Sequence, residues 1–343
     1  MNRLLSCCAI LLAFLLAAPA VLLPLVASAA VSPSESPATT SSSTPAATPA
    51  YPLLASIRPI ALLASELGDG LPLQVDTLLP SGTSTHDFAL SPSDLARVRG
   101  ARLLLWLGPA GEPYLAKVMA SQRNDLRWEE LLDVTRLPFR SALHDEDEHE
   151  SEEQDHDPNS HDQDSHTAHH HTGTDPHLWW STSNAILLAR ALAQRIGTDQ
   201  PDWAPRLQQN LQALEQRLEQ QRTEQRQRLA TNAKPFLLAH DAFFYLEEDL
   251  GIHSEAALML DPENRPGLQH LVELKQRVAR QQIACVLTGA LVPASLIDKI
   301  DTQPPLLRVS VDELGWDFNG ERYSEWLALT YGKIAECVLR SSG

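Results

Sequence analysis

Residues 235–240 read Pro-Phe-Leu-Leu-Ala-His, a short apolar run that follows a long helical pattern at 204–230. A second apolar run, Ile-Ala-Cys-Val-Leu-Thr at 283–288, follows the next helical pattern, at 265–281. Apolar runs of this length are typical of strands buried on both faces, and helices between them are typical of crossovers between parallel strands. This half of the chain therefore predicts parallel strands that alternate with helices.

The same alternation occurs in the first part of the chain, before the helical stretches at 182–230. The candidate strands over the whole chain are 52–57, 73–79, 102–107, 235–240, 255–260, 283–288 and 306–311. The candidate helices are 60–67, 93–98, 182–196, 204–230, 265–281 and 323–339. We therefore predict an α/β fold with two lobes, each with a parallel sheet, joined by helix. Neither lobe carries G-x-G-x-x-G after its first strand or a Walker A sequence, so nothing supports nucleotide binding.

Length and charge narrow the class of protein. The chain has 343 residues and a formal net charge of −17, and this length fits roughly two domains. The acidic balance excludes nucleic acid as a partner, because binding phosphates requires a basic face. No apolar stretch after residue 30 approaches the roughly 20 residues of a membrane-spanning helix, so a polytopic membrane protein is excluded as well.

The first 30 residues predict export. One basic residue is followed by an apolar run that extends to Val26, and Ala27-Ser28-Ala29-Ala30 resembles the small-residue site of a cleaved secretory signal. We expect cleavage after Ala29 or Ala30, and an uncleaved anchor is the alternative, because the run is long. Residues 31–50 are almost entirely Ser, Thr, Pro and Ala, which predicts a solvated linker. The folded part then begins near Tyr51.

Export leaves two cysteines in the mature chain, Cys285 and Cys337, because Cys7 and Cys8 lie in the signal. In an oxidising compartment two remaining cysteines most often form a disulfide. Two separate buried thiols are the alternative.

A segment at 144–171 combines many histidines with acidic residues. It holds eleven Asp and Glu residues and no Lys or Arg. Its histidines are His144, His149, His156, His161, His166, His169, His170 and His171. Such an acidic tract cannot build a core, which predicts a loop. Neutral imidazoles suit zinc, copper or nickel, and neighbouring carboxylates raise the local concentration of cations, so we expect this loop to capture transition metal.

Three further histidines stand where strands end or loops begin. His86 follows the predicted strand 73–79, His177 precedes the helix at 182–196, and His240 ends the strand 235–240. Ligand sites of open α/β sheets lie beyond the carboxyl ends of the strands, so these three are candidate metal ligands. His253 and His270 lack such positions and are expected to be ordinary surface or structural residues.

Three motifs surround these histidines. They are Leu79-Pro80-Ser81-Gly82 leading to His86-Asp87-Phe88, then Asp175-Pro176-His177-Leu178-Trp179, and then Ala239-His240-Asp241-Ala242-Phe243. In this order they resemble the ligand motifs of zinc ABC-transporter solute-binding proteins. Residues 55–59 and 264–267 fit as well, and the His-rich segment stands directly before the second motif. The similarity extends from about residue 51 to 340.

This resemblance implies a periplasmic protein that captures Zn²⁺ in the cleft between two lobes and delivers it to an ABC permease and, through the permease, its ATPase. It implies an N-terminal lobe at 51–178, a rigid linker helix at 179–200 and a C-terminal lobe at 201–343. The protein would act as a monomer and would not be an enzyme.

The resemblance also assigns roles to residues. His86 and His177 would be zinc ligands from the first lobe and His240 from the second. The cysteines at 285 and 337 match a second-lobe disulfide of zinc-type members.

Two departures bear on the choice of metal. Some members have a glutamate before the first histidine, where Thr85 stands, and manganese-type relatives have a carboxylate after the strand at 283–287, where this chain reads Thr288-Gly289-Ala290. Three imidazoles without a carboxylate favour zinc over manganese, which prefers oxygen donors. Water or a histidine of the loop would be the fourth ligand.

Two other functions stay open at this point. Three histidines and a water also form the site of zinc hydrolases, although H-E-x-x-H is absent and no glutamate adjoins a candidate ligand. A periplasmic zinc buffer or metallochaperone that never meets a permease would have the same ligands.

Overall fold

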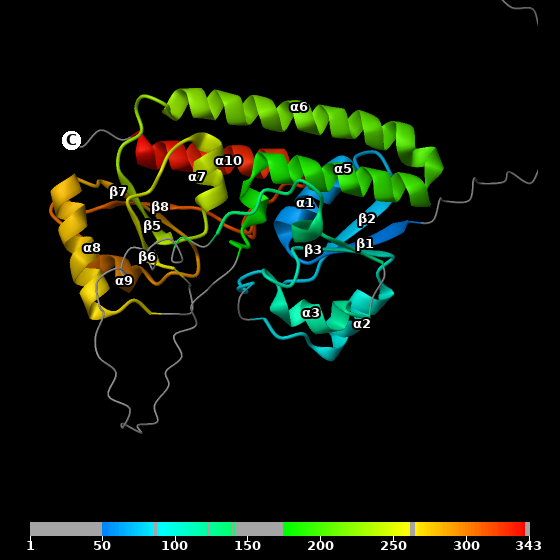
Figure 1. Cartoon of the computed structure of the whole chain (residues 1–343), viewed down its shortest axis with the longest axis horizontal. Helices are drawn as coiled ribbons and strands as arrows, with labels where there is room; N and C mark the ends of the chain where they lie inside the picture. Colours follow the sequence, from blue (N-terminus) through cyan, green and yellow to red (C-terminus); the bar gives the residue numbers. More distant parts are fainter. Residues whose placement is uncertain are drawn as a thin grey trace, which may run out of the picture. The chain divides into compact units, whose positions relative to one another are not determined.

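Two four-stranded parallel sheets organise the chain in the structure, a computed structural model (Figure 1). It describes residues 50–85, 88–121, 124–138, 140, 174–260 and 265–339. The predicted signal (1–30), all of the predicted linker except residue 50, and the His-rich loop at 144–171 lie outside the described residues.

The two sheets have the same topology. The first contains β1 (Tyr51–Ala55), β2 (Leu73–Thr77), β3 (Leu103–Trp106) and β4 (Asp125–Arg127), in the order β2-β1-β3-β4. The second contains β5 (Phe236–His240), β6 (Ala256–Met259), β7 (Cys285–Thr288) and β8 (Leu307–Ser310), in the order β6-β5-β7-β8. Every pair of neighbours is parallel, so the predicted α/β fold with two parallel sheets is confirmed.

Helices connect the strands in each half. Around the first sheet they are α1 (Arg58–Leu67), α2 (Pro92–Gly100) and α3 (Pro113–Met119). Around the second they are α7 (Phe244–Leu250), α8 (Leu268–Gln281), α9 (Ala294–Ile300) and α10 (Tyr323–Val338). The start of α2 is well defined by its sequence, because Ser91 and Asp94 form a capping box and Pro92 occupies the first turn.

The sequence analysis missed β4 and the short helices α3, α7 and α9. β4 is a three-residue edge strand, Asp-Leu-Arg, that offers one apolar side chain and no apolar run. The three helices have seven residues each, which is too short for helical periodicity to stand out.

Two long helices lie between the sheets in the sequence and run side by side (Figure 1). They are α5 (Thr182–Asp199) and α6 (Ala204–Leu229), joined by a short 3-10 turn at Pro201–Trp203. The very polar α6 buries a single stripe of leucines spaced by four, three and four residues, namely Leu207, Leu211, Leu214 and Leu218. None of the described helices is both long and apolar enough to span a membrane.

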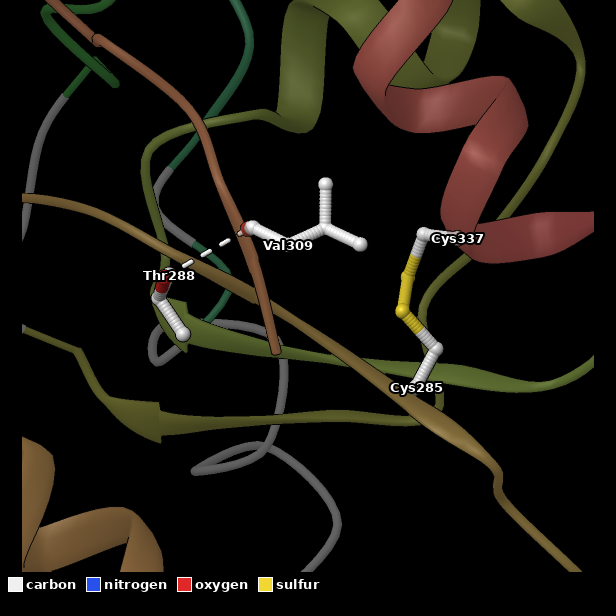
Figure 2. Close-up of a disulfide and its surroundings, with 4 residues drawn as sticks. All are labelled: Cys285, Thr288, Val309 and Cys337. Carbon is white, nitrogen blue, oxygen red and sulfur yellow. Dashed lines mark hydrogen bonds between the residues drawn. A yellow bond between two sulfur atoms is a disulfide. The ribbon is translucent and has the colours of Figure 1, made fainter. Parts of the chain in front are cut away.

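Helix α10 fastens the second sheet to the rest of the fold. It packs against β7, β8, α6 and α1. Near its carboxyl end, Cys337 forms a disulfide with Cys285, the first residue of β7, with a Cα–Cα distance of 5.5 Å (Figure 2). On the neighbouring strands, the Thr288 hydroxyl donates a hydrogen bond to the carbonyl oxygen of Val309 (Figure 2). The predicted pairing of the two cysteines is thus present.

Candidate functional site

His177 is held by an aspartate two residues before it. Its backbone N–H and its ring Nδ1 both bind Asp175 Oδ1, at 2.8 and 2.7 Å. Both side chains are buried, with 3% of each exposed. A carboxylate only accepts hydrogen bonds, so Nδ1 carries the proton and Nε2 is the nitrogen whose electron pair can coordinate a metal ion.

His240 is the last residue of β5 and is buried as well. Its Nδ1 lies 3.2 Å from Oε2 of Glu313, in the loop after β8. The same argument assigns the proton to Nδ1 and the metal-binding electron pair to Nε2. Both imidazoles therefore have the pairing with a carboxylate that is usual for histidines that bind metal ions.

The two imidazoles lie against each other although they come from different halves of the chain. Their ring centroids are 5.4 Å apart and the rings meet edge to face. His177 follows the strands of the first sheet in the sequence and directly precedes the 3-10 turn Leu178–Trp180, whereas His240 ends a central strand of the second sheet. Two neutral imidazoles at this separation can bind one borderline-soft divalent ion.

The third candidate ligand, His86, and its neighbour Asp87 lie outside the residues that the structure describes. Thr85, directly before them, is buried. Among the described residues, no three His, Cys, Asp or Glu side chains form a group that could hold a metal ion. The described part of the candidate site therefore consists of His177 and His240 with the carboxylates of Asp175 and Glu313.

Two tryptophans follow His177 and have different surroundings. Trp179 meets the ring of His177 edge to face at 5.1 Å, and its Nε1 donates to the carbonyl oxygen of Glu313. Trp180 stacks on Trp326 at 4.7 Å and is completely buried. Trp179 thus packs against the His177 ring, whereas Trp180 stacks within the apolar core.

Asp241, next to His240, pairs with an arginine instead of a histidine. Arg140 Nε lies 3.2 Å from Asp241 Oδ1, and Arg140 Nη2 lies 3.0 Å from Glu247 Oε1. Burial raises the pKa of Asp241 and of Glu247, and the guanidinium opposes both shifts. Among the described residues, the carboxylates that pair with the imidazoles are thus Asp175, inside the predicted motif, and Glu313, which the sequence analysis missed.

The segment that carries His177 is tied to the second half. The hydroxyl of Tyr245, on α7, donates to the carbonyl oxygen of Asp175 at 2.9 Å and accepts from the backbone N–H of Leu137. The hydroxyl of Tyr323, at the start of α10, donates to the carbonyl oxygen of Trp179 at 2.6 Å. Two buried hydroxyls of the second half therefore fix the backbone on either side of His177.

The remaining histidines have ordinary surroundings where they are described. His253 is 69% exposed and lies 3.9 Å from a Glu248 oxygen, and His270 Nε2 lies 3.1 Å from the carbonyl oxygen of Ala257. The eight histidines of the loop at 144–171 lie outside the described residues.

Two parallel sheets of identical topology, connected by long helices and with buried histidines brought together from the two halves, define the two-lobed fold of solute-binding proteins. The chain belongs to the family described as zinc-uptake complex component A, periplasmic, which it matches over residues 53–337. The resemblance expected from the three motifs is confirmed.

Individual relatives agree with this membership. The chain is 30% identical over 295 residues to the high-affinity zinc uptake system protein ZnuA of Yersinia pestis, which covers 83% of this chain and 91% of that protein. It is 32% identical over 292 residues to the protein of the same name from Haemophilus ducreyi, covering 83% and 93%. A solved structure described as ZnuA has a TM-score of 0.67 at 20% identity and covers 84% of this chain and 99% of its own.

Proposed function

We propose that this protein captures Zn²⁺ in the periplasm and delivers it to an ABC permease and its ATPase. The observation that carries the proposal is the contact between His177 and His240 at 5.4 Å, each with a carboxylate on Nδ1. Membership of the zinc-uptake family and the names of the relatives support zinc as the metal.

The proposed ligands are His177, His240 and, from the segment outside the described residues, His86. Neutral imidazoles fit a tetrahedral zinc shell, which a water or a loop histidine completes. Zinc is the substrate of this site, and the buried carboxylates Asp175 and Glu313 balance part of its charge.

The ligand assignment is tested by titrating zinc against a competing chelator. Replacing His86, His177 or His240 by Ala should each weaken the tight site at least about tenfold, because a lost imidazole leaves an incomplete shell. His253→Ala is the matched control, since that histidine is on the surface, and it should bind like the unchanged protein. A tight site that survives all three replacements would show that the metal is held elsewhere.

We propose a separate role for the loop at 144–171, which would bind zinc more weakly and pass it to the tight site. Deleting it should remove the additional weak sites from the titration and leave one tight zinc. Loss of the tight site in the deleted protein would contradict this division of roles.

Delivery to an importer, rather than buffering, is tested in cells. A strain that lacks this protein should fail to grow under zinc limitation even when the permease is present, and the protein with all three ligands replaced should not rescue it. Growth equal to that of the parent would favour a buffer. Purified protein should not hydrolyse ester or peptide substrates with zinc bound, and turnover abolished by His177→Ala would instead support the hydrolase.

The proposal includes export with removal of residues 1–30 and the division into lobes at 51–178 and 201–343 with the helix at 179–200 between them. Amino-terminal sequencing of the periplasmic protein should begin at Ala30 or Val31. A chain that begins at Met1 would indicate an anchor instead.

A further inference from the structure

Glu313 reaches the imidazole of His240 across the end of a strand that lies between them. In the second sheet β7 separates β5, which ends at His240, from β8, which leads to Glu313. The register pairs Leu238 with Leu287, so His240 is level with Gly289. The Glu313 side chain therefore passes over Gly289 to bring Oε2 within 3.2 Å of His240 Nδ1.

Gly289 leaves the space that this carboxylate occupies. A Cβ atom at Gly289 would lie 2.0 Å from Glu313 Oε1, far inside van der Waals contact. Gly289 is not among the residues with a positive φ, so its backbone would accept alanine, and the restriction is steric. The segment that follows β7 has no acidic residue of its own. Glu313, in the loop after β8, thus supplies a carboxylate at this position.

Within the described part of the chain, no cationic side chain contacts the largely buried carboxylate of Glu313. Its side chain is 11% exposed, its Oε1 has no hydrogen-bond partner among the described residues, and its one ion-pair contact there is with the His240 ring. An ionised carboxylate in such surroundings costs free energy unless a positive charge compensates it. A divalent ion bound to the other nitrogen of the same imidazole supplies that charge.

The loop that carries Glu313 is held by the first half of the chain. Arg58, at the start of α1, donates from Nε to the carbonyl oxygen of Gly315 and from Nη2 to that of Phe318, both at 2.6 Å. Trp179 Nε1 donates to the carbonyl oxygen of Glu313 itself at 3.1 Å. Arg58 and Trp179 thus hold the backbone of the loop that carries this carboxylate.

We infer that Glu313 is a positioning residue for zinc binding, and that Gly289 is required to admit it. Glu313 keeps the proton of His240 on Nδ1, fixes the plane of the ring and makes Nε2 a stronger donor to the metal. The inference rests on the proposed function, in which His240 is a zinc ligand.

The test measures zinc affinity by chelator competition in the full mature chain. Glu313→Ala should weaken the tight site by about 10- to 100-fold, the usual effect of losing such a carboxylate. Glu313→Gln, whose carbonyl oxygen still accepts the Nδ1 proton, should weaken it less. Asp317→Ala removes an exposed carboxylate from the same loop and should have no effect, so it controls for long-range charge.

Gly289→Ala provides the second arm, because its methyl group displaces Glu313 without removing it. It should weaken zinc binding about as much as Glu313→Ala, and the double variant should be no weaker than Glu313→Ala alone, since the two changes remove the same contact. Thermal melts of the zinc-free proteins establish that all variants fold.

A spectroscopic readout separates positioning from general stability. Imidazole ¹⁵N–¹H correlation spectra of the zinc-free protein at pH 8 should show the His240 proton on Nδ1 in the unchanged protein and in Glu313→Gln. In Glu313→Ala the proton should shift towards Nε2.

The outcomes distinguish this inference from the function on which it rests. Unchanged affinity and unchanged tautomer in Glu313→Ala, with a weakened His240→Ala, would overturn the role of Glu313 and leave the zinc site standing. Additive losses in the double variant would overturn the role of Gly289. Unchanged affinity in His240→Ala would overturn both the ligand assignment and the role of Glu313.

Discussion

The side chain of Glu66, on α1, caps the amino terminus of α10. Removing this carboxylate should destabilise the fold without changing the contacts of His177 and His240. Helix α10 has Arg322 at its N-cap position, which makes no side-chain capping bond. Instead Glu66 accepts the backbone N–H of Ser324 at 2.9 Å and its hydroxyl at 2.7 Å, and forms an ion pair with Arg217 of α6. The Glu66 side chain is 2% exposed, so the three helices meet at a buried carboxylate.

The magnitude follows from the groups that Glu66→Ala leaves without a partner. Hydrogen bonds to a charged group contribute about 1.5–3 kcal/mol each, and a lost helix cap costs about 1 kcal/mol. These contributions overlap at Ser324, so we expect the free energy of unfolding to fall by about 3 kcal/mol. For a chain of this size, that lowers the Tm by about 5 °C.

The assay is urea unfolding of the zinc-free protein, because bound metal stabilises the folded state and would mask the change. Glu66→Gln keeps the shape and one acceptor oxygen and should lose about half as much. Glu325→Ala is the matched control: it lies in the first turn of the same helix, but its side chain is 59% exposed and 3.8 Å from Arg322, so it should change stability by less than about 0.5 kcal/mol. If Glu66→Ala unfolds at the same urea concentration as Glu325→Ala, the carboxylate does not cap α10.

Three further changes test other parts of the fold. Replacing Cys285 and Cys337 by Ser should lower the free energy of unfolding by about 4 kcal/mol, on the chain-entropy argument for cysteines 52 residues apart. Under non-reducing conditions the mass of the unchanged protein should be two hydrogen atoms less than that of the dithiol. Alkylation of both thiols without reduction would contradict the disulfide. Burial raises the pKa of Glu112 to about 7, so the stability that its protonated form contributes is present below about pH 4.5 and is lost as the pH rises to 7. Glu112→Gln is neutral throughout, and its free energy of unfolding relative to the unchanged protein should rise by about 2 to 3 kcal/mol from pH 5 to pH 8; a difference independent of pH would refute the shift. Arg140→Met leaves the buried carboxylates of Asp241 and Glu247 uncompensated and should cost about 3 kcal/mol in urea unfolding, whereas a stability equal to that of the unchanged protein would show that the ion pairs contribute nothing net.

The sequence predicts the parts of the fold that depend on continuous apolar runs. β5 and β7 are such runs, buried on both faces, and their positions follow directly from hydrophobicity. β4 could not be found in this way, because an edge strand of Asp-Leu-Arg forms through pairing with β3 and not through its own composition. Local pattern therefore predicts the centre of each sheet better than its edge.

The same division applies to the site. Asp175 stands two residues before His177, so a short motif contains both the proposed ligand and its carboxylate. Glu313 is 73 residues from His240, and nothing in the sequence near it indicates a histidine partner. One general signal was present: Glu313 follows β8 closely, and functional side chains gather beyond the carboxyl ends of parallel strands.

The hydrogen bonds that fix the site explain why its proposed positioning residues are harder to find from the sequence than its proposed ligands. Three side chains donate hydrogen bonds to carbonyl oxygens around the site. Tyr245 donates to Asp175, Tyr323 donates to Trp179, and the ring of Trp179 donates to Glu313. A carbonyl oxygen is present whatever the side chain, so the accepting position leaves no mark in the sequence. Only the side chains that reach the site, and the small residues that make room for them, are constrained in type. Substitution of Gly289 is therefore expected to affect the carboxylate of Glu313, which belongs to the loop after another strand.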